Sequence, residues 1–343
     1  MKVLVIGFGK MGMVHAATLP FVPGIEEVLI CESAPFVADG IRTFNPAQKI
    51  YKDYQTPLRN KEFSMAVIAT PTPTHQAIFK DLVQNGISVF VEKPFMGSLQ
   101  EALEAHQWYV SRAPRSCKVM VGYCLRFLST FQYAKKALEQ NALGRILHFE
   151  AKTHASSVTS TGVGWRFERS ASGGGATLEL GSHLVDLVRD LFGMPQKISA
   201  VTSKWVSKNV EDYCHAILQY GQFLGTVEVC WSMPNNRKPN TEIVVYGTNG
   251  KMVITNDFVQ MFLEEVIKGY VQGPQIKYAV QMEGQVPYNL GGAFLTCQLI
   301  EFVGAVKNNG THRNTLEESV ETHSLLDSML VSGGENVVPR KAK

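Results

Sequence analysis

The feature that most constrains this chain is a short apolar strand pattern that runs directly into a glycine-rich turn. Residues 3–12 read VLVIGFGKMG. In a dinucleotide-binding βαβ unit, the first glycine makes the tight turn, the second lets a pyrophosphate approach the backbone, and the third lets the helix pack on its strand. The pyrophosphate then lies at the helix N-terminus. We therefore expect this turn to bind a dinucleotide through Gly7, Phe8, Gly9, Lys10, Met11 and Gly12.

The sequence after the turn has the context that this motif requires. Residues 11–19 can form a helix, which Pro20 would end, and Glu27–Cys31 reads as a second buried strand. Glu32 follows that strand, twenty residues after Gly12. A carboxylate there can accept hydrogen bonds from both adenosine ribose hydroxyls and would repel a 2′-phosphate. This favours NAD over NADP; the alternative is that Glu32 only ends a solvated strand.

Composition limits the other classes of function. The chain has 343 residues, of which 45% are hydrophobic, and a net charge of +3, with basic residues clustered only at 340–343. This predicts a globular protein of two domains or one large one, with no nucleic-acid partner. Its six cysteines lack metal-site spacing, and no apolar run is long enough for a membrane span. We expect a cytoplasmic protein without a metal or a membrane anchor.

The first part of the chain alternates strand and helix patterns, which predicts a parallel sheet with helices on both faces. A capping box, Ser98 to Glu101, opens a helix that runs to about Arg112. The expected strands are Lys2–Ile6, Glu27–Cys31, Phe63–Ala69, Ser88–Val91 and Lys118–Val121.

From Gly144 onward, consecutive strand patterns predict a large, mostly antiparallel sheet. Helices are expected over Ala176–Phe192 and Gly292–Lys307, and a last helix begins at the capping box Thr315 to Glu318. The fold class is therefore α/β, with an N-terminal dinucleotide-binding domain (1–122), a C-terminal α+β domain with an open sheet (123–314), and a final helix (315–332) that packs back on the first domain. The expected strands are 146–153, 197–204, 213–220, 223–231, 241–246 and 251–255.

Polar segments follow two of the parallel strands, where a dinucleotide would lie. The first reads TPTPTH, and we expect cofactor contacts from Thr70, Pro71, Thr72 and His75; its alternative is a purely structural loop. The second contains Glu92 and Lys93, which we place beside the nicotinamide half of the cofactor. A lysine there can hold or receive the proton of a substrate hydroxyl if its pKa is lowered.

A third polar group lies on an otherwise apolar helix. Glu179, His183 and Asp186 are spaced i, i+4 and i+7 and share one helix face. They form either a hydrogen-bonded structural trio or an active site in which His183 accepts a proton and Glu179 orients it or the substrate. A metal site at the same pair would lack an evident third ligand.

The motifs GFGKMG, TPTPTH, EKP, GYCLRF (122–127) and GGGATLELGSH (173–183) occur in this order, and the chain resembles the Gfo/Idh/MocA oxidoreductases. The resemblance implies a Rossmann domain followed by an α/β domain whose open sheet serves in oligomerisation. It also implies oxidation of a secondary hydroxyl of a sugar, sugar nucleotide or cyclitol, or the reverse reduction. A homodimer or homotetramer is expected on the same ground.

The resemblance also assigns roles to residues. The lysine of EKP is Lys93, and the family's aspartate and histidine correspond to Glu179 and His183, so these three are the expected catalytic residues. Tyr123 and Arg126 match an aromatic residue and an arginine of the family and are expected at the substrate. The sequence departs from the family's pattern at two places. Glu179 stands where the family commonly has an aspartate, and Cys124 and Leu125 replace a polar pair.

Trp165 and Arg166 complete the expected substrate site, because an arginine can bind a carboxylate or phosphate with two hydrogen bonds. The sequence thus predicts an NAD-dependent dehydrogenase of a carbohydrate-like alcohol, with NADP the less favoured cofactor. Two alternatives remain on the same fold: a glycosidase that uses NAD for transient oxidation, and a non-catalytic NAD-binding sensor.

Overall fold

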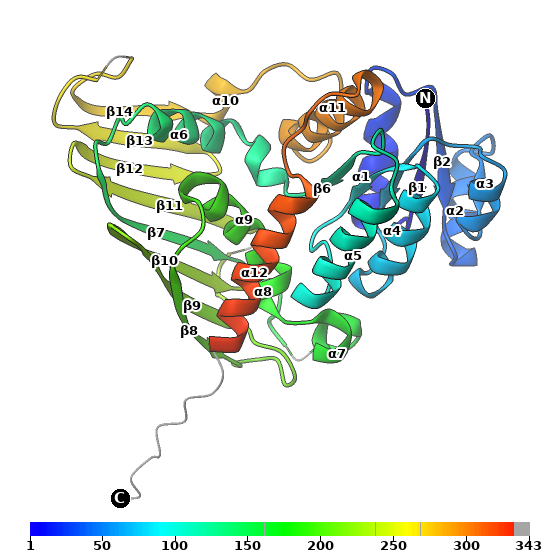
Figure 1. Cartoon of the computed structure of the whole chain (residues 1–343), viewed down its shortest axis with the longest axis horizontal. Coiled ribbons are helices and arrows are strands. Elements are labelled where there is room, and N and C mark those ends of the chain that lie inside the picture. Colours follow the sequence, from blue (N-terminus) through cyan, green and yellow to red (C-terminus); the bar gives the residue numbers. More distant parts are fainter. Residues whose placement is uncertain (161, 237, 268, 333–343) are drawn as a thin grey trace, which may run out of the picture. The chain divides into compact units, whose positions relative to one another are not determined.

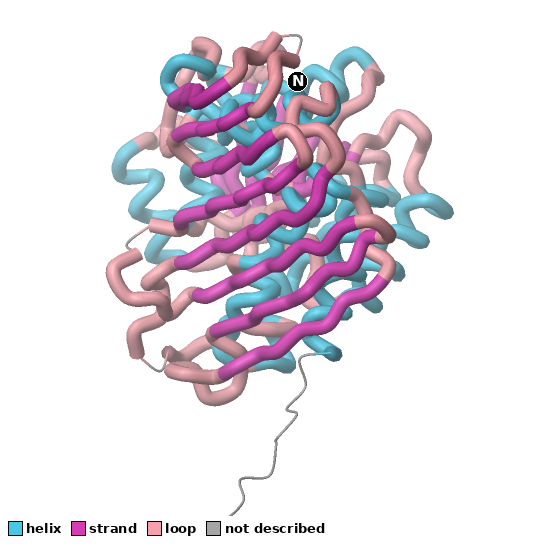
Figure 2. Tube along the Cα trace, turned by 90° about the vertical axis from the view of Figure 1, so that its left-hand side faces the viewer, coloured by secondary structure: helices cyan, strands magenta, loops and turns pink. Residues whose placement is uncertain are grey.

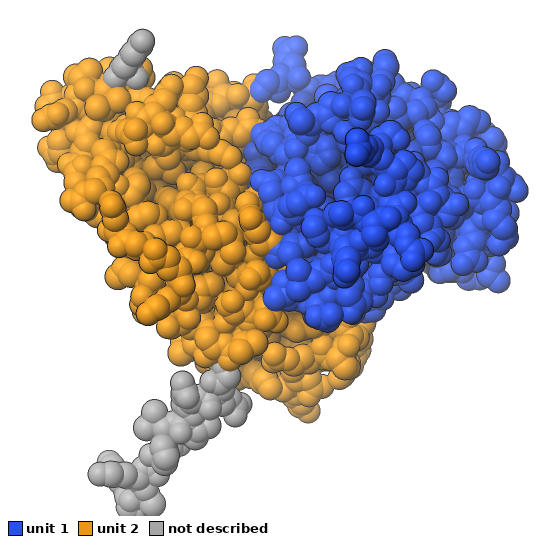
Figure 3. Space-filling model, in the orientation of Figure 1, with its two compact units in different colours: residues 1–127, 284–320 blue, residues 128–283, 321–343 orange. Residues whose placement is uncertain are grey.

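The computed structural model describes residues 1–160, 162–236, 238–267 and 269–332, so the basic cluster at 340–343 lies outside the described residues. The chain divides into two compact units, which Figure 3 colours separately. Unit 1 comprises residues 1–127 and 284–320, and unit 2 comprises 128–283 and the residues from 321. This division differs from the predicted one in two ways. Residues 123–127 and 284–314 belong with the N-terminal unit, and the described part of the final helix from residue 321 belongs with unit 2.

Unit 1 contains a six-stranded sheet in the order β3-β2-β1-β4-β5-β6, in which every pairing is parallel. Figure 1 labels β1, β2 and β6 of this sheet. β1, β2 and β5 have the predicted bounds, whereas β4 and β6 are shorter than predicted and the two-residue β3 was not expected. The strands are β1 (Lys2–Ile6), β2 (Glu27–Cys31), β3 (Ile50–Tyr51), β4 (Met65–Ile68), β5 (Ser88–Val91) and β6 (Val119–Val121).

Both faces of this sheet are buried, as the continuous apolar strands predict. Leu4 and Ile6 of β1 point into a core with helices α4 and α5, and Val3 and Val5 point into a second core with α11. Phe302 of α11 is fully buried there, which is why this helix belongs to unit 1. The helices of unit 1 include α1 (Lys10–Thr18), α2 (Pro35–Phe44), α3 (Gln55–Arg59), α4 (His75–Gln84), α5 (Leu99–Arg112) and α11 (Ala293–Asn308), with 3-10 turns at Leu19–Phe21, Thr72–Thr74 and Cys124–Phe127.

Unit 2 is built on an eight-stranded sheet in the order β14-β13-β12-β11-β7-β10-β9-β8. Only the β10–β7 pair is parallel among the pairings described. The last two strands were not predicted. The strands are β7 (Ile146–His154), β8 (Lys197–Ser203), β9 (Tyr213–Tyr220), β10 (Phe223–Cys230), β11 (Asn240–Gly247), β12 (Gly250–Thr255), β13 (Phe258–Leu263) and β14 (Gly273–Tyr278).

One face of this sheet packs on helices, and Figure 2 shows the other face uncovered. On the packed face, the rings of Phe149 and Phe192 stack with centroids 4.0 Å apart. A Cβ at Gly225 would lie 2.1 Å from the Phe149 ring, so a glycine is required at this point of β10. The helices of this unit are α6 (Ser129–Glu139), α7 (Arg169–Ser172), α8 (Ala176–Glu179), α9 (Gly181–Phe192) and α10 (Ala279–Met282), with a 3-10 turn at Trp165–Phe167.

Helix α12 (Leu316–Ser332) begins with the predicted capping box. The Thr315 hydroxyl accepts from the Glu318 N–H at 3.3 Å, and the Glu318 carboxylate accepts from the Thr315 N–H at 2.9 Å. Two otherwise unsatisfied backbone donors are thereby paired. At α5 the Ser98 hydroxyl also caps the helix, but the Glu101 carboxylate binds the N–H of Gly97.

Among the described residues, no helix is both long and apolar enough to cross a membrane. The six cysteines are all free thiols. Burial raises the pKa of Cys31 and of Cys117 to about 12, so neither thiol ionises near neutral pH.

The Thr315 cap gives a test of the assignment of α12. Replacing Thr315 with Ala removes the hydroxyl that accepts from Glu318 and should lower the free energy of unfolding by about 1 kcal/mol. Urea denaturation would measure this change. Thr315→Ser keeps the acceptor and should remain close to the parent; equal losses in both variants would contradict the capping role.

Candidate active site

The glycine turn between β1 and α1 has the geometry expected of a dinucleotide cradle. Gly7 has φ +88°, a conformation that L side chains rarely adopt, and its N–H donates to the Cys31 carbonyl at 2.9 Å. A Cβ at Gly12 would lie 2.0 Å from the Gly7 carbonyl oxygen, so α1 approaches the turn too closely for any other residue.

Gly9 differs from the other two glycines. It has ordinary φ and ψ angles of −72° and −169°, and a Cβ there would meet no protein atom within 4 Å. The fold itself therefore does not require a glycine at this position. A pyrophosphate lying against the backbone would require it, so the turn fits the cofactor that the motif implies.

Glu32 lies directly after β2 and contacts the glycine turn. Its two carboxylate oxygens accept from the N–H groups of Phe8, at 2.9 Å, and Ala34, at 2.7 Å. Each oxygen retains acceptor capacity, because a carboxylate can accept about four hydrogen bonds. The side chain is thus fixed beside the turn and can still accept from ribose hydroxyls.

The segment 70–75 follows β4 and is held by its own hydrogen bonds. The Thr74 hydroxyl donates to Thr70 Oγ1 at 2.6 Å and is also within 2.8 Å of the Pro71 carbonyl. Thr72 and His75 are buried. Burial lowers the pKa of His75, although hydrogen bonds to the carbonyl groups of Thr70 and Phe95 act in the opposite direction.

Glu92 and Lys93 follow β5. The Glu92 carboxylate lies 2.6 Å from Nε2 of His15, a fully buried residue of α1, and it also accepts from the backbone N–H of Lys93 at 3.2 Å. Glu92 was predicted to bind the cofactor; its side chain makes these two intramolecular contacts, and its contact with the cofactor stays a prediction. His15 was not predicted; its signal was a histidine three residues after Gly12 on the buried side of an apolar helix.

Tyr123 and Arg126, which were predicted to contact substrate, are buried in unit 1. The hydroxyls of Tyr123 and Ser319 are 3.2 Å apart, and the Asn314 amide donates to the Tyr123 carbonyl at 3.0 Å. Arg126 donates to Glu318 at 2.9 Å. These contacts favour a structural role for both side chains, and their contact with substrate stays a prediction.

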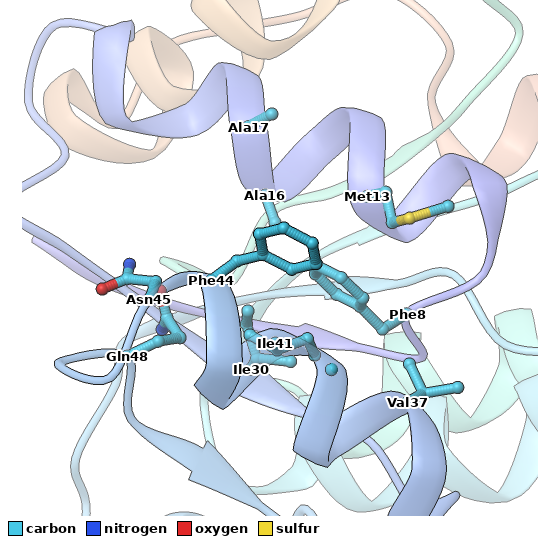
Figure 4. A pocket seen from close by; sticks show the side chains of 11 residues that line it. Phe8, Met13, Ala16, Ala17, Ile30, Val37, Ile41, Phe44, Asn45 and Gln48 are labelled. Atoms are coloured by element: carbon cyan, nitrogen blue, oxygen red, sulfur yellow. The ribbon is translucent and has the colours of Figure 1, made fainter.

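An apolar cavity of about 410 Å³ lies between α1 and α2 in unit 1 (Figure 4). Phe8 of the glycine turn contributes to it, but Glu32, the 70–75 segment and Lys93 do not. The cavity is therefore separate from the polar residues of the candidate site. Its lining comprises Phe8, Met13, Ala16, Ala17, Ile30, Val37, Gly40, Ile41, Phe44, Asn45 and Gln48.

In unit 2, a buried glutamate holds the glycine-rich turn that precedes α8. One Glu211 carboxylate oxygen accepts from the N–H groups of Gly175, at 2.8 Å, and Thr177, at 3.1 Å. A Cβ at Gly175 would lie 2.1 Å from the Glu211 carbonyl oxygen. The close backbone contact explains this glycine. Sequence reasoning missed Glu211, although an acidic pair before a strand pattern was visible.

The next residue, Asp212, fixes the loop that follows β8. It accepts from the N–H groups of Trp205, Val206 and Ser207 and from the Trp231 indole at 2.7 Å. Burial favours the neutral form of Asp212, but the hydrogen bonds from Ser207 and Trp231 outweigh it and lower the pKa.

The predicted helix 176–192 is present as α8 and α9, with Leu180 in a helical conformation between them. Glu179 and His183 are half-buried, and Arg166 lies 3.1 Å from the Glu179 carboxylate. Asp186 is fully buried and accepts from the Thr322 hydroxyl at 3.1 Å. The structure thus pairs Glu179 with Arg166 and Asp186 with Thr322, and both predicted interpretations of the trio stay predictions.

Trp165 belongs to the same group. The Arg166 guanidinium lies 5.6 Å from the centre of the Trp165 ring, within cation–π range. No group of three or more His, Cys, Asp or Glu side chains in the described part of the chain is arranged to hold a metal ion.

Two family models match the sequence. Residues 1–123 match the NAD-binding Rossmann fold of the Gfo/Idh/MocA oxidoreductase family, and residues 131–253 match the C-terminal domain of the same family.

Two curated relatives are dehydrogenases. A levoglucosan dehydrogenase of Pseudarthrobacter phenanthrenivorans is 27% identical over 217 residues, which are 60% of this chain and 55% of that enzyme. A scyllo-inositol 2-dehydrogenase (NAD(+)) of Bacillus subtilis is 26% identical over 260 residues, or 73% of this chain and 72% of that enzyme. The chain thus aligns with little more than half of the length of the first relative.

A solved levoglucosan dehydrogenase in complex with NADH and levoglucosan superposes with a TM-score of 0.85. The match covers 97% of each chain at 21% sequence identity. At this identity the likeness establishes a common fold.

The different surroundings of Gly9 and Gly12 give a matched pair of substitutions. Gly9→Ala should leave the melting temperature unchanged and weaken NADH binding about tenfold, because the added methyl occupies space that only the cofactor would use. Gly12→Ala should lower the melting temperature, because its methyl meets the Gly7 carbonyl. Fluorescence titration with NADH and thermal denaturation measure the two effects. Unchanged NADH affinity in Gly9→Ala would contradict the assignment.

Proposed function

Because this chain belongs to the Gfo/Idh/MocA family of oxidoreductases, we propose that it is an NAD-dependent dehydrogenase of a carbohydrate-like secondary alcohol. The substrate class is a sugar, sugar derivative, nucleotide sugar or cyclitol, oxidised to a ketone or formed from one. The relatives named above act on levoglucosan and scyllo-inositol, which supports this class.

The observation that carries the proposal is the order of the parallel strands. β1, β4 and β5 are adjacent in the sheet, so Gly7, Thr70 and Lys93, which follow them, emerge at the same carboxyl edge. In open parallel sheets ligands bind at this edge. One unit therefore carries the glycine turn and a lysine at the same edge of the sheet, which is the arrangement that a dehydrogenase needs.

NAD would be held by residues 7–12, by Glu32 at the ribose and by the segment that follows β4. The preference for NAD over NADP rests on Glu32, whose negative charge would repel a 2′-phosphate. When bound, the nicotinamide supplies hydride acceptance, which no side chain can provide. The protein's part is to place the substrate and to move its proton.

We assign the proton chemistry to Lys93 and His183. His183 takes the proton of the substrate hydroxyl as the carbon loses hydride, and Lys93 polarises the same oxygen. Glu179 orients His183 or the substrate, and Arg166, itself paired with Glu179, offers hydrogen-bond donors to substrate oxygens. In the reverse direction His183 returns the proton to the ketone oxygen.

The experiment that tests the function is a turnover screen. The protein is mixed with NAD or NADP and a panel of sugars, sugar acids, inositols and nucleotide sugars, and NADH absorbance is followed. Net NADH formation supports the proposal and identifies the substrate. Tight NAD binding without net redox change, with or without cleavage of a glycoside, would contradict it and favour the glycosidase or the sensor.

Lys93→Ala should lower kcat by about 100- to 10,000-fold, because it removes a group that exchanges or stabilises a proton in the transition state. NADH affinity should change little. Steady-state kinetics and fluorescence titration separate the two effects. Lys52→Ala, which removes an exposed lysine of the same unit, is the matched control. Unchanged kcat in Lys93→Ala would remove this lysine from the mechanism.

We also propose that the protein self-associates through the open face of the unit 2 sheet. This face exposes apolar side chains on several strands, among them Val201, Ile217, Leu224 and Phe262. Extended apolar patches on a protein surface mark interaction sites. A second copy of this chain is the expected occupant of the face.

The protein is also expected in a reducing compartment such as the cytoplasm, because its six cysteines are free thiols.

Ile217→Glu tests the association. Ile217 lies on β9, between the neighbouring strands β8 and β10, and a charge there would be buried in the interface. Light scattering should show the parent as a dimer or tetramer and the variant as a smaller species. Val110→Glu, on an exposed apolar side chain of α5, should keep the mass of the parent. A monomeric parent would contradict the proposal.

A further inference from the structure

Two buried histidines of unit 1 have no role in the proton chemistry assigned above. His15 lies on α1 and His75 at the start of α4, and both are essentially inaccessible to solvent. Polar groups are placed in an apolar interior at a cost unless they are hydrogen-bonded. Each histidine makes one contact within hydrogen-bond distance of the segment Glu92–Phe95, which contains Lys93.

His15 holds the segment at its first residue. The imidazole Nε2–H donates to Glu92 at 2.6 Å, and the other carboxylate oxygen of Glu92 accepts from the Lys93 N–H at 3.2 Å. The ring also packs edge-on against Phe90 of β5, with centroids 5.2 Å apart. A continuous path of contacts therefore connects α1, whose N-terminus is the cofactor cradle, with the backbone of Lys93.

His75 holds the segment at its last residue. Its Nδ1 lies 3.1 Å from the Phe95 carbonyl oxygen, and its Nε2 lies 2.9 Å from the Thr70 carbonyl oxygen. One ring thus contacts the loop that follows β4 and the loop that follows β5. In the neutral form that burial favours, it donates its single N–H to one of these two carbonyl oxygens. Because Phe95 is two residues beyond Lys93, the lysine is fixed on both sides.

We propose that His15 and His75 are positioning residues that hold Glu92–Phe95 in place and thereby aim the Lys93 amine. The inference rests on the proposed function, since Lys93 is the group being aimed. A lysine side chain has four rotatable bonds, so a small shift of its backbone displaces the amine by more than the shift itself. A displacement of about 1 Å of a reacting group can cost about 100-fold in rate.

Two substitutions at His15 form a matched pair. In His15→Gln the side-chain amide nitrogen can occupy the place of Nε2 and donate to Glu92, whereas the amide in His15→Asn is too short to reach. We expect His15→Asn to lower kcat about 100-fold with NADH affinity within about threefold of the parent, and His15→Gln to recover most of this loss. Equal kcat in both variants would overturn the role of His15.

Hydrogen exchange gives a readout that needs no substrate. Amide exchange over residues 91–97 should be faster in His15→Asn than in the parent and should be restored in His15→Gln. A purely structural role would instead raise exchange throughout α1 and β5 and lower the melting temperature equally in both variants. Should His15→Asn fail to fold, Glu92→Gln replaces it, because it keeps the shape and weakens the same contacts.

At His75 we expect the opposite order of the Asn and Gln variants. His75→Asn keeps a donor near Nδ1, facing Phe95, and His75→Gln keeps one near Nε2, facing Thr70. The proposal expects kcat and protection of residues 91–97 to be higher in His75→Asn than in His75→Gln. The opposite order would overturn the role of the Phe95 contact.

The two proposals fail in different ways. If the protein is not a dehydrogenase, the exchange pattern persists and no variant shows turnover. If the protein is a dehydrogenase but His15 has no positioning role, the parent shows turnover, and His15→Asn has the kcat of the parent and the same protection of residues 91–97.

Discussion

The close approach of α1 to the turn that precedes it is the constraint on which the candidate site depends. With Gly12 against the Gly7 carbonyl, the helix starts directly at the end of β1, and its free N–H groups face the carboxyl edge of the sheet. The strand order then places the loops after β4 and β5 at the same edge. A larger residue at position 12 would move the helix away from this edge, and with it His15, which contacts the Lys93 loop through Glu92.

Buried carboxylates fix the irregular segments of both units. In unit 1, Glu92 accepts from a histidine and from the backbone of Lys93. In unit 2, Glu211 accepts from two N–H groups at the start of α8, and Asp212 accepts from three consecutive N–H groups of the loop that follows β8. Hydrogen bonds from several donors stabilise an ionised carboxylate and satisfy buried backbone groups, so these loops can be both irregular and rigid.

Much of the fold followed from the sequence because local signals were strong. The bounds of β2 and β5 were predicted correctly, since each is a short apolar run bounded by turn-forming or charged residues. The Thr315 capping box was also confirmed. β13 and β14 were missed because their sequences, FVQMFL and GPQIKY, lie among turn residues and the second carries a proline. The place of α11 in unit 1 depends on long-range packing of Phe302, which periodicity does not reveal. For the site, the glycine turn and Lys93 were evident, but the partners of Glu92, Tyr123 and Arg126 required the tertiary structure.

The central claim is that this protein transfers hydride between a nicotinamide and a carbohydrate-like carbon. The most direct measurement is to supply NADH deuterated at the transferable position together with candidate ketoses or inosose analogues, and to analyse the products by mass spectrometry. Our account predicts an alcohol product that carries one deuterium on the carbinol carbon, with a large loss of labelling in Lys93→Ala. Bound NADH that retains its deuterium with every ketone tested, or a product formed without the label, would contradict it.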